Sequence, residues 1–326
     1  MKLTKRLTIA LTGLALLGIA GAATAEYPTK PVTLVAPYGP GGASDLAART
    51  LSATAPSYLG NGVLVVNRTG AAGVTGSTTV AKGKADGYTL LLSRVGSQAA
   101  VPAINRTIPY AWHEFTFLGL LELNPFVLAV KADSPYQSLD DIKKAIEGGA
   151  DLSYSSAGVG TLLHVAMVMV LDSFGMGADA MKHVPYKGGG KAAAAAAGGH
   201  VDMIFQNLSG VIGNIQAGNM RALVVTTPER VLAIKDVPTA AEAGYPDLGQ
   251  VIGWSGLWGP PGLPEEVQTK WIEVLAQLKE DKAWNKLTKG LGSVPDIRSP
   301  EDTKAFVQTQ YETFKTLTEK LGMTIQ

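Results

Sequence analysis

The chain has 326 residues, of which 28 are basic and 27 acidic, and it contains no cysteine. This length is sufficient for a large core without disulfides and for two domains. The balanced charge, with no basic stripe, argues against a nucleic-acid partner, and the lack of cysteine excludes a lipid-modified cysteine and a thiol nucleophile.

Residues 1–25 have the pattern of a secretory signal peptide. Three basic residues among the first six precede an uncharged apolar run over residues 7–20, and the small-x-small site Ala23-Thr24-Ala25 follows. The apolar run is shorter than the roughly 18 to 20 residues that a bilayer span needs, which disfavours the alternative of an uncleaved membrane anchor. We expect cleavage near Ala25 and a free periplasmic protein.

Strand-like and helix-like segments alternate along the rest of the chain. Apolar, β-branched runs predict strands at residues 32–36, 63–67, 88–93, 126–131, 152–155, 183–186, 201–205 and 222–226. Apolar residues at helical spacing and capping residues predict helices at 44–58, 73–82, 139–147, 161–174 and 191–197. Strands that are apolar without strict alternation are typical of parallel sheets covered on both faces, so the predicted fold class is α/β.

The C-terminal segment is predicted to be helical at residues 264–289 and 300–321. A helical block with no sheet of its own must pack on an existing sheet, so we expect it to return to the first lobe. The chain would then cross between two lobes near residues 126–131 and 251–258. This predicts lobe 1 as residues 26–126 with 252–326, and lobe 2 as residues 127–251.

The strongest local feature is the loop at residues 37–45, which follows a predicted strand, contains three glycines and leads into a predicted helix. N–H groups at a helix start are unpaired and carry partial positive charge, and glycine lets a ligand approach them closely. An ordinary turn capped by Ser44 or Asp45 is the alternative. The candidate ligand-binding residues in this loop are Tyr38, Gly39, Pro40, Gly41, Gly42, Ser44 and Asp45.

A second loop, at residues 155–161, has the same construction and adds hydroxyl donors. Two such loops in different halves of an exported protein suggest two helix starts that face one cleft, at the carboxyl ends of strands. The candidates here are Ser155, Ser156, Gly158, Gly160, Thr161 and His164.

Four further side chains are candidates at the ends of predicted strands. Arg94, followed by Ser97, ends the third predicted strand, and its guanidinium suits a second ligand carboxylate, although a surface arginine is the alternative. Asp202 and Asn207 flank a later strand and are candidates for orienting hydroxyl or amide groups of a ligand. Because an aspartate repels an anion, Asp202 is better suited to anchoring backbone.

Nothing in the sequence favours an enzyme. The four histidines show no HExxH or other metal-ligand spacing, and there is no G-x-S-x-G elbow. Glycine-rich residues 67–76 lack the spacing of a dinucleotide fingerprint, and residues 188–191 lack that of a phosphate loop. We therefore expect no catalytic residues, no metal and no cofactor.

Several motifs occur in a characteristic order, at residues 27–32, 37–45, 66–73, 85–90, 155–164, 184–189, 237–245, 254 and 260–262. Together they resemble the extracytoplasmic solute receptors of the tripartite tricarboxylate transporters, the Bug proteins. The resemblance implies a two-lobed clamshell whose loops at residues 37–45 and 155–161 close on a ligand carboxylate, largely through backbone amides. Tyr38 and Arg94 depart from the residues of many family members.

The resemblance further implies a periplasmic protein that carries a di- or tricarboxylate or an aromatic acid to a two-subunit membrane carrier. We expect this protein to be a monomer. A ligand sensor for a membrane signalling kinase is one alternative. A secreted α/β enzyme is another.

Overall fold

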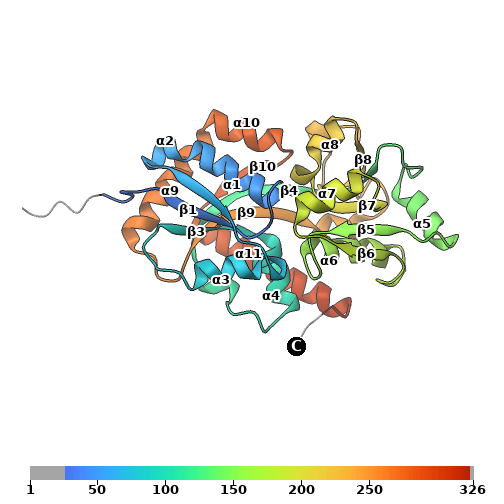
Figure 1. The fold of residues 1–326 in the computed structure, drawn as a ribbon, viewed down its shortest axis with the longest axis horizontal. Helices are drawn as coiled ribbons and strands as arrows, with labels where there is room; N and C mark the ends of the chain where they lie inside the picture. Colours follow the sequence, from blue (N-terminus) through green and yellow to red (C-terminus); the bar gives the residue numbers. More distant parts are fainter. Residues whose placement is uncertain (1–25, 324–326) are drawn as a thin grey trace, which may run out of the picture.

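The computed structural model describes residues 26–323. The predicted signal peptide and its cleavage site lie outside the described residues. Figure 1 shows an elongated molecule in which two groups of strands and helices lie end to end and are joined by long central strands. None of the helices in the described part of the chain combines the length and the apolar character needed to cross a membrane.

The first strand group contains three parallel strands and one antiparallel strand, in the order β2-β1-β3-β9. Their apolar side chains pack against the surrounding helices around Leu34, Leu92 and Trp271. The strands are β1 (Val32–Ala36), β2 (Val63–Asn67), β3 (Thr89–Arg94) and β9 (Ile252–Gly259). The helices are α1 (Ala43–Thr54), α2 (Pro56–Leu59), α3 (Val74–Ala81), α4 (Val101–Ile104), α9 (Glu265–Glu280) and α10 (Lys282–Gly290), with a π-helix at Gly96–Ala100.

The second strand group repeats this plan, with β7, β5 and β6 parallel to one another. Helix α6 is apolar on nearly all sides because it is buried almost throughout its length. The strands are β5 (Ser153–Ser156), β6 (Lys182–Pro185), β7 (Met203–Asn207) and β8 (Met220–Val225). The helices are α5 (Leu139–Glu147), α6 (Leu162–Ser173), α7 (Gly189–Ala197) and α8 (Ile212–Gln216).

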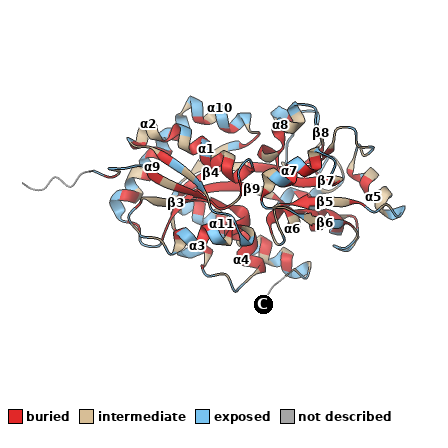
Figure 2. Cartoon of the chain, in the orientation of Figure 1, coloured by how far each residue is buried: buried red, intermediate tan, exposed pale blue. Residues whose placement is uncertain are grey.

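Strand β4 (Thr116–Lys131) belongs to both groups. Its residues 116–125 pair with β9, and its residues from Phe126 onward pair with β7 and β8, all antiparallel. The ten strands of the described residues therefore form one continuous sheet, whose central strands are the most deeply buried part of the molecule (Figure 2). The predicted strand covered only the second half of β4, because Glu122 and Pro125 interrupt the apolar run.

The C-terminal segment packs back on this sheet. Helices α9 and α10 contact α2 and α1, and α11 (Pro300–Lys320) packs against β4, α4 and the π-helix. The end of α11 reaches α6, where Lys320 Nζ lies 2.9 Å from Asp172 Oδ2. Contrary to expectation, the segment also contributes a strand, β10 (Val294–Arg298), which pairs with β4 at the sheet edge.

Candidate functional site

Three helices begin at one small cavity between the two strand groups. The N-cap residue and the first two helical residues of both α1 and α6 line it, and so does the first residue of α7. None of the three N-cap residues makes a side-chain cap hydrogen bond. The backbone N–H groups of these first turns therefore have no side-chain acceptor, although His164 N–H of α6 already donates to Thr161 O at 2.9 Å. The helix dipoles make this space attractive to an anion. The helix-start residues at the cavity are Gly42, Ala43, Ser44, Thr161, Leu162, Leu163 and Gly189.

Two buried polar side chains at the cavity have no hydrogen-bond partner among the described residues. They are the Ser44 hydroxyl and the Gln206 amide nitrogen, in residues that are 4% and 1% exposed. Because an unpaired buried polar group costs about 1–3 kcal/mol, such groups normally have a partner. One donor comes from each strand group, and both suit an acceptor atom of a bound molecule.

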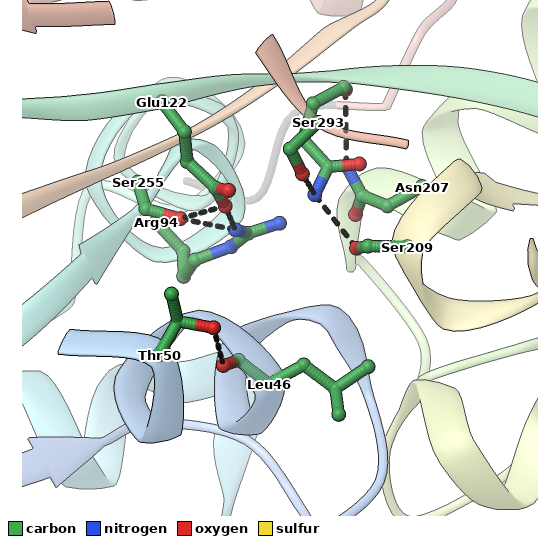
Figure 3. A network of polar contacts seen from close by, with 9 residues as sticks. Leu46, Thr50, Arg94, Glu122, Asn207, Ser209, Ser255 and Ser293 are labelled. Atoms are coloured by element: carbon green, nitrogen blue, oxygen red, sulfur yellow. Dashed lines mark hydrogen bonds and ion pairs between the residues drawn. The ribbon is translucent and has the colours of Figure 1, made fainter. Parts of the chain in front are cut away.

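Arg94 is the charged residue among the described residues that line the cavity. Its Nη1 donates to Ser255 Oγ at 2.5 Å and lies 3.5 Å from Glu122 Oε1, and Ser255 Oγ donates to the same carboxylate oxygen at 2.8 Å. Figure 3 shows the other terminal nitrogen of Arg94 directed away from both partners. Burial lowers the pKa of Arg94, whereas Glu122 raises it. The arginine is thus a buried cation with a built-in counter-ion.

The cavity is small in this structure, with a volume of about 40 Å³. A water needs roughly 10–15 Å³ of such space, so there is room for a group the size of a carboxylate. A groove of about 470 Å³ shares Tyr38 and Ala157 with the cavity and is lined by loop residues of both strand groups. The cavity itself therefore holds no larger group in this structure.

In the first loop, Asp45 braces the backbone. Its carboxylate accepts hydrogen bonds from Gly41 N–H (3.0 Å), Arg49 Nε (2.9 Å) and Asn67 Nδ2 (3.0 Å). Burial opposes its ionisation, but the bonds from Arg49, Gly41 and Asn67 bring the pKa of Asp45 below its ordinary value. Tyr38 lines the cavity and donates its hydroxyl to Ala72 O at 2.9 Å. The Asp45 carboxylate therefore holds the loop in its conformation, and its oxygens already accept hydrogen bonds from within the protein.

In the second loop, the hydroxyl groups are occupied by bonds within the protein. Ser155 Oγ donates to Ala192 O (2.9 Å), and Ser156 and Thr161 donate to Gly158 O (3.0 and 2.7 Å). Gly158 and Gly160 have φ angles of 135° and 73°, which only glycine adopts readily, and Gly160 N–H donates to His164 Nδ1 at 3.2 Å. These residues set the loop conformation, and of the predicted residues in this loop Thr161 lines the cavity.

Two histidines stack beneath this loop. The rings of His164 and His183 are 4.2 Å apart and nearly parallel, and His183 Nε2 lies 2.6 Å from Ser156 Oγ. Burial lowers the pKa of His164, and burial together with the charge of His164 lowers the pKa of His183 to about 4. Both rings are therefore neutral near pH 7. Within residues 26–323 no group of three or more histidine or acidic side chains is placed to hold a metal ion.

The other predicted site residues divide between the cavity and the scaffold. Asn207 ends β7, lines the cavity and donates to Asn124 O at 3.4 Å. Asp202 lies at the opposite end of β7, where it accepts from Ser153 N and Ser153 Oγ, both at 2.7 Å. Ser97 is fully buried, and its hydroxyl donates to Arg94 O at 3.4 Å. Gly39 lines the groove, and the other loop glycine, Gly41, has a φ of 73°.

The first loop also packs against residues 187–190, main chain on main chain. A methyl group on Gly190 would lie 2.6 Å from Pro40 O, and one on Gly39 would lie 2.9 Å from Lys187 O. Only glycine permits this approach between the two strand groups. From the sequence, residues 188–191 were excluded as a phosphate loop, and neither Gln206 nor the partners of Arg94 were predicted at the site. Glu122 is a single acidic residue in an apolar run, and a buried acid needs a buried cation as its partner. It was therefore the sequence signal that could have pointed to the pairing of Arg94.

Comparison with known proteins places the chain among solute receptors. Residues 47–323 match the model of the "Tripartite tricarboxylate transporter family receptor". Protein BugT of Bordetella pertussis is 30% identical over 326 residues, covering 99% of both chains. The structure of the periplasmic binding protein BugD has a TM-score of 0.86 and 30% identity over 92% of this chain and all of that one. MatC from Rhodopseudomonas palustris, solved with bound malate, has a TM-score of 0.84 and 27% identity over 89% of this chain and 99% of that one.

Proposed function

The chain belongs to the family of tripartite tricarboxylate transporter receptors, and from this premise we propose that it captures a small organic carboxylate at the cavity between its two strand groups. The observation that carries the proposal is the convergence of three helix N-termini without side-chain caps on one buried space. Such a site binds an anion without any free cationic side chain. Malate, the ligand of MatC, is an acid of this class.

The ligand-binding residues are, on this proposal, of two kinds. The backbone of α1, α6 and α7 and the Ser44 hydroxyl receive the carboxylate, and Gln206, Asn207 and Arg94 contact the rest of the ligand. Asp45, Ser155, Ser156, His164 and Asp202 hold the loops and strands in place. The pocket is thus made mainly of main-chain donors.

The two lobes are residues 26–126 with 252–326, and residues 127–251. Strand β4 changes partners at Pro125 and Phe126, from β9 to β7, which supports a hinge at this point. Opening about the hinge would admit the ligand, and closure would remove water and strengthen each N–H to carboxylate bond. Delivery to a two-subunit membrane carrier, after export by a signal peptide cleaved near Ala25, completes the proposed role. Co-purification with such a carrier, and not with a membrane kinase, distinguishes transport from sensing.

One contact favours a second candidate, a hydrolase, because Ser156 and His183 lie at the distance of a nucleophile and its base. However, Gly158 O lies 3.0 Å from Ser156 Oγ and competes for its single proton, and neither Ser156 nor His183 lines the cavity. A pKa of about 4 also makes His183 a weak base. We therefore propose binding without turnover, and mass spectrometry after prolonged incubation should recover the ligand unaltered.

Isothermal titration calorimetry tests the proposed function. The mature protein is titrated with small mono-, di- and tricarboxylates and, as controls, with the corresponding fully amidated compounds. Carboxylates of at least one kind should bind and their uncharged amides should not. Binding of the amides with equal affinity, or no binding of any acid, would rule the proposal out.

A further inference from the structure

The charged residue of the cavity lining, Arg94, already has a counter-ion. Arg94 is 3% exposed and has the Glu122 carboxylate, in a residue that is 2% exposed, as its counter-ion. Asp45, which adjoins the cavity residue Ser44 in the chain, is likewise paired, since its Oδ2 lies 2.9 Å from Arg49 Nε. What remains unmatched is the partial charge of the helix starts, roughly half an elementary charge each.

From this charge pattern we infer that the ligand carries a single carboxylate and, beyond it, an uncharged hydrogen-bond acceptor that Arg94 contacts. The inference rests on the proposed function and narrows its ligand class. At roughly half an elementary charge each, the three helix N-termini together offset about one and a half negative charges, which suffices for one carboxylate and not for two. A second carboxylate at Arg94 would add a buried charge, because Glu122 already balances that arginine, and an unbalanced buried charge is costly.

The donors at the cavity fit an uncharged acceptor. Arg94 directs one terminal nitrogen away from Glu122 and Ser255 (Figure 3), and Gln206 Nε2 has no partner among the described residues. A carbonyl, amide or hydroxyl oxygen accepts from both groups without changing the net charge. Ser255 bonds both Arg94 and Glu122 and so holds the guanidinium in position.

Matched pairs of ligands test the inference directly. Malonate, succinate and adipate are each compared with their monoamides by calorimetry at pH 7.5, where the diacids are dianions and the monoamides are monoanions of nearly equal shape. The monoamide of the best-fitting length should bind at least tenfold more tightly than its diacid. Equal or tighter binding of the diacid would overturn the inference while leaving the proposed function intact. If none of the six compounds and no other carboxylate binds, the proposed function itself fails and this inference with it.

A charge-neutralising variant adds a second, independent readout. Glu122→Gln keeps an oxygen for the Ser255 hydroxyl but removes the counter-ion of Arg94. The affinity ratio of diacid to monoamide should rise at least tenfold in this variant. Glu242→Gln, which removes the acid of an exposed ion pair with Arg230, should leave the ratio unchanged. An unchanged ratio in folded Glu122→Gln protein would contradict the inference, and if that variant does not fold, the comparison in the natural protein still decides.

Discussion

Ser44 is a residue whose side chain we expect to contribute to ligand binding and not to stability. Its hydroxyl is buried at the start of α1, lines the cavity and has no partner within the described residues. The hydroxyl of Thr288 in α10 is equally buried and unpartnered but lies away from the cavity. The two residues therefore form a matched pair for separating ligand binding from stability.

Ser44→Ala should weaken carboxylate binding by roughly 10- to 100-fold, the loss of one hydrogen bond to a charged group. The free energy of unfolding should change little, because no protein contact of the hydroxyl is lost. Calorimetry and chemical denaturation measure the two effects. Thr288→Val is the control and should leave affinity unaltered, whereas unaltered affinity in Ser44→Ala would remove this residue from the binding site.

Asp45 is expected to affect stability rather than to contact the ligand. Its folded-state pKa is depressed, so its contribution is present above the ordinary aspartate pKa and is lost as pH falls through the folded value. At pH 7, Asp45→Asn should lower the free energy of unfolding by about 1–3 kcal/mol, since bonds from Gly41, Arg49 and Asn67 are weakened. Urea denaturation at pH 7 and pH 3 checks this expectation. A difference between the two proteins as large at pH 3 as at pH 7 would contradict it.

The stacked histidines add a pH dependence in the same direction, because here too the folded-state pKa is depressed. Because the folded-state pKa of His183 is depressed to about 4, its neutral form is favoured in the folded protein. The natural protein should therefore lose stability as pH falls from about 6.5 toward 4. His183→Phe preserves an aromatic ring against His164 and should make this decline shallower in denaturation curves. If the stability of the variant declines equally steeply with falling pH, the loss of stability is due to other titratable groups.

At the level of elements, the contact between the first loop and the start of α7 is made of glycine backbone. Gly190 lies within α7, where alanine is a better helix former, so Gly190→Ala should not unfold the helix. Its methyl group would meet Pro40 O at 2.6 Å and hold the two strand groups apart. We expect affinity for the carboxylate to fall at least tenfold, with unchanged circular dichroism.

The matched control for this prediction is Gly213→Ala. Gly213 lies in α8, and a methyl group there meets no atom within 4 Å. Small-angle scattering with saturating ligand should show a larger radius of gyration for Gly190→Ala than for Gly213→Ala. Identical scattering and identical affinity would show that the glycine contact does not govern closure.

The element order was predictable because most strands and helices carry their own local signal. Helix α5 has the predicted bounds, since Ser138 caps it and apolar residues recur at helical spacing. Strand β10 was missed because Val294–Arg298 contains a proline and charged residues and lies at a sheet edge. The first half of β4 was missed because pairing with β9, a long-range contact, extends the strand past Glu122.

At the scale of the whole molecule, features of the site with a local sequence signal were predictable, and features that depend on long-range contacts were not. The loops at residues 37–45 and 155–161 can be predicted from the sequence, because their glycines follow directly on strand ends. Other features depend on segments that meet only after folding. They are the contribution of Gln206, the start of α7 at the cavity, and the ion pair of Arg94 with Glu122. No local sequence pattern predicts these long-range contacts. The sequence therefore predicts Arg94 as a cation available to a ligand carboxylate, whereas the folded chain pairs it with Glu122.

The central claim is that a ligand carboxylate lies between the N-termini of α1 and α6. A crystal structure of the mature protein with its tightest-binding acid is the most direct measurement. Carboxylate oxygens should lie within hydrogen-bond distance of backbone N–H groups in residues 42–44 and 161–163. A carboxylate held instead by surface lysines or arginines, with these N–H groups facing solvent, would contradict the claim.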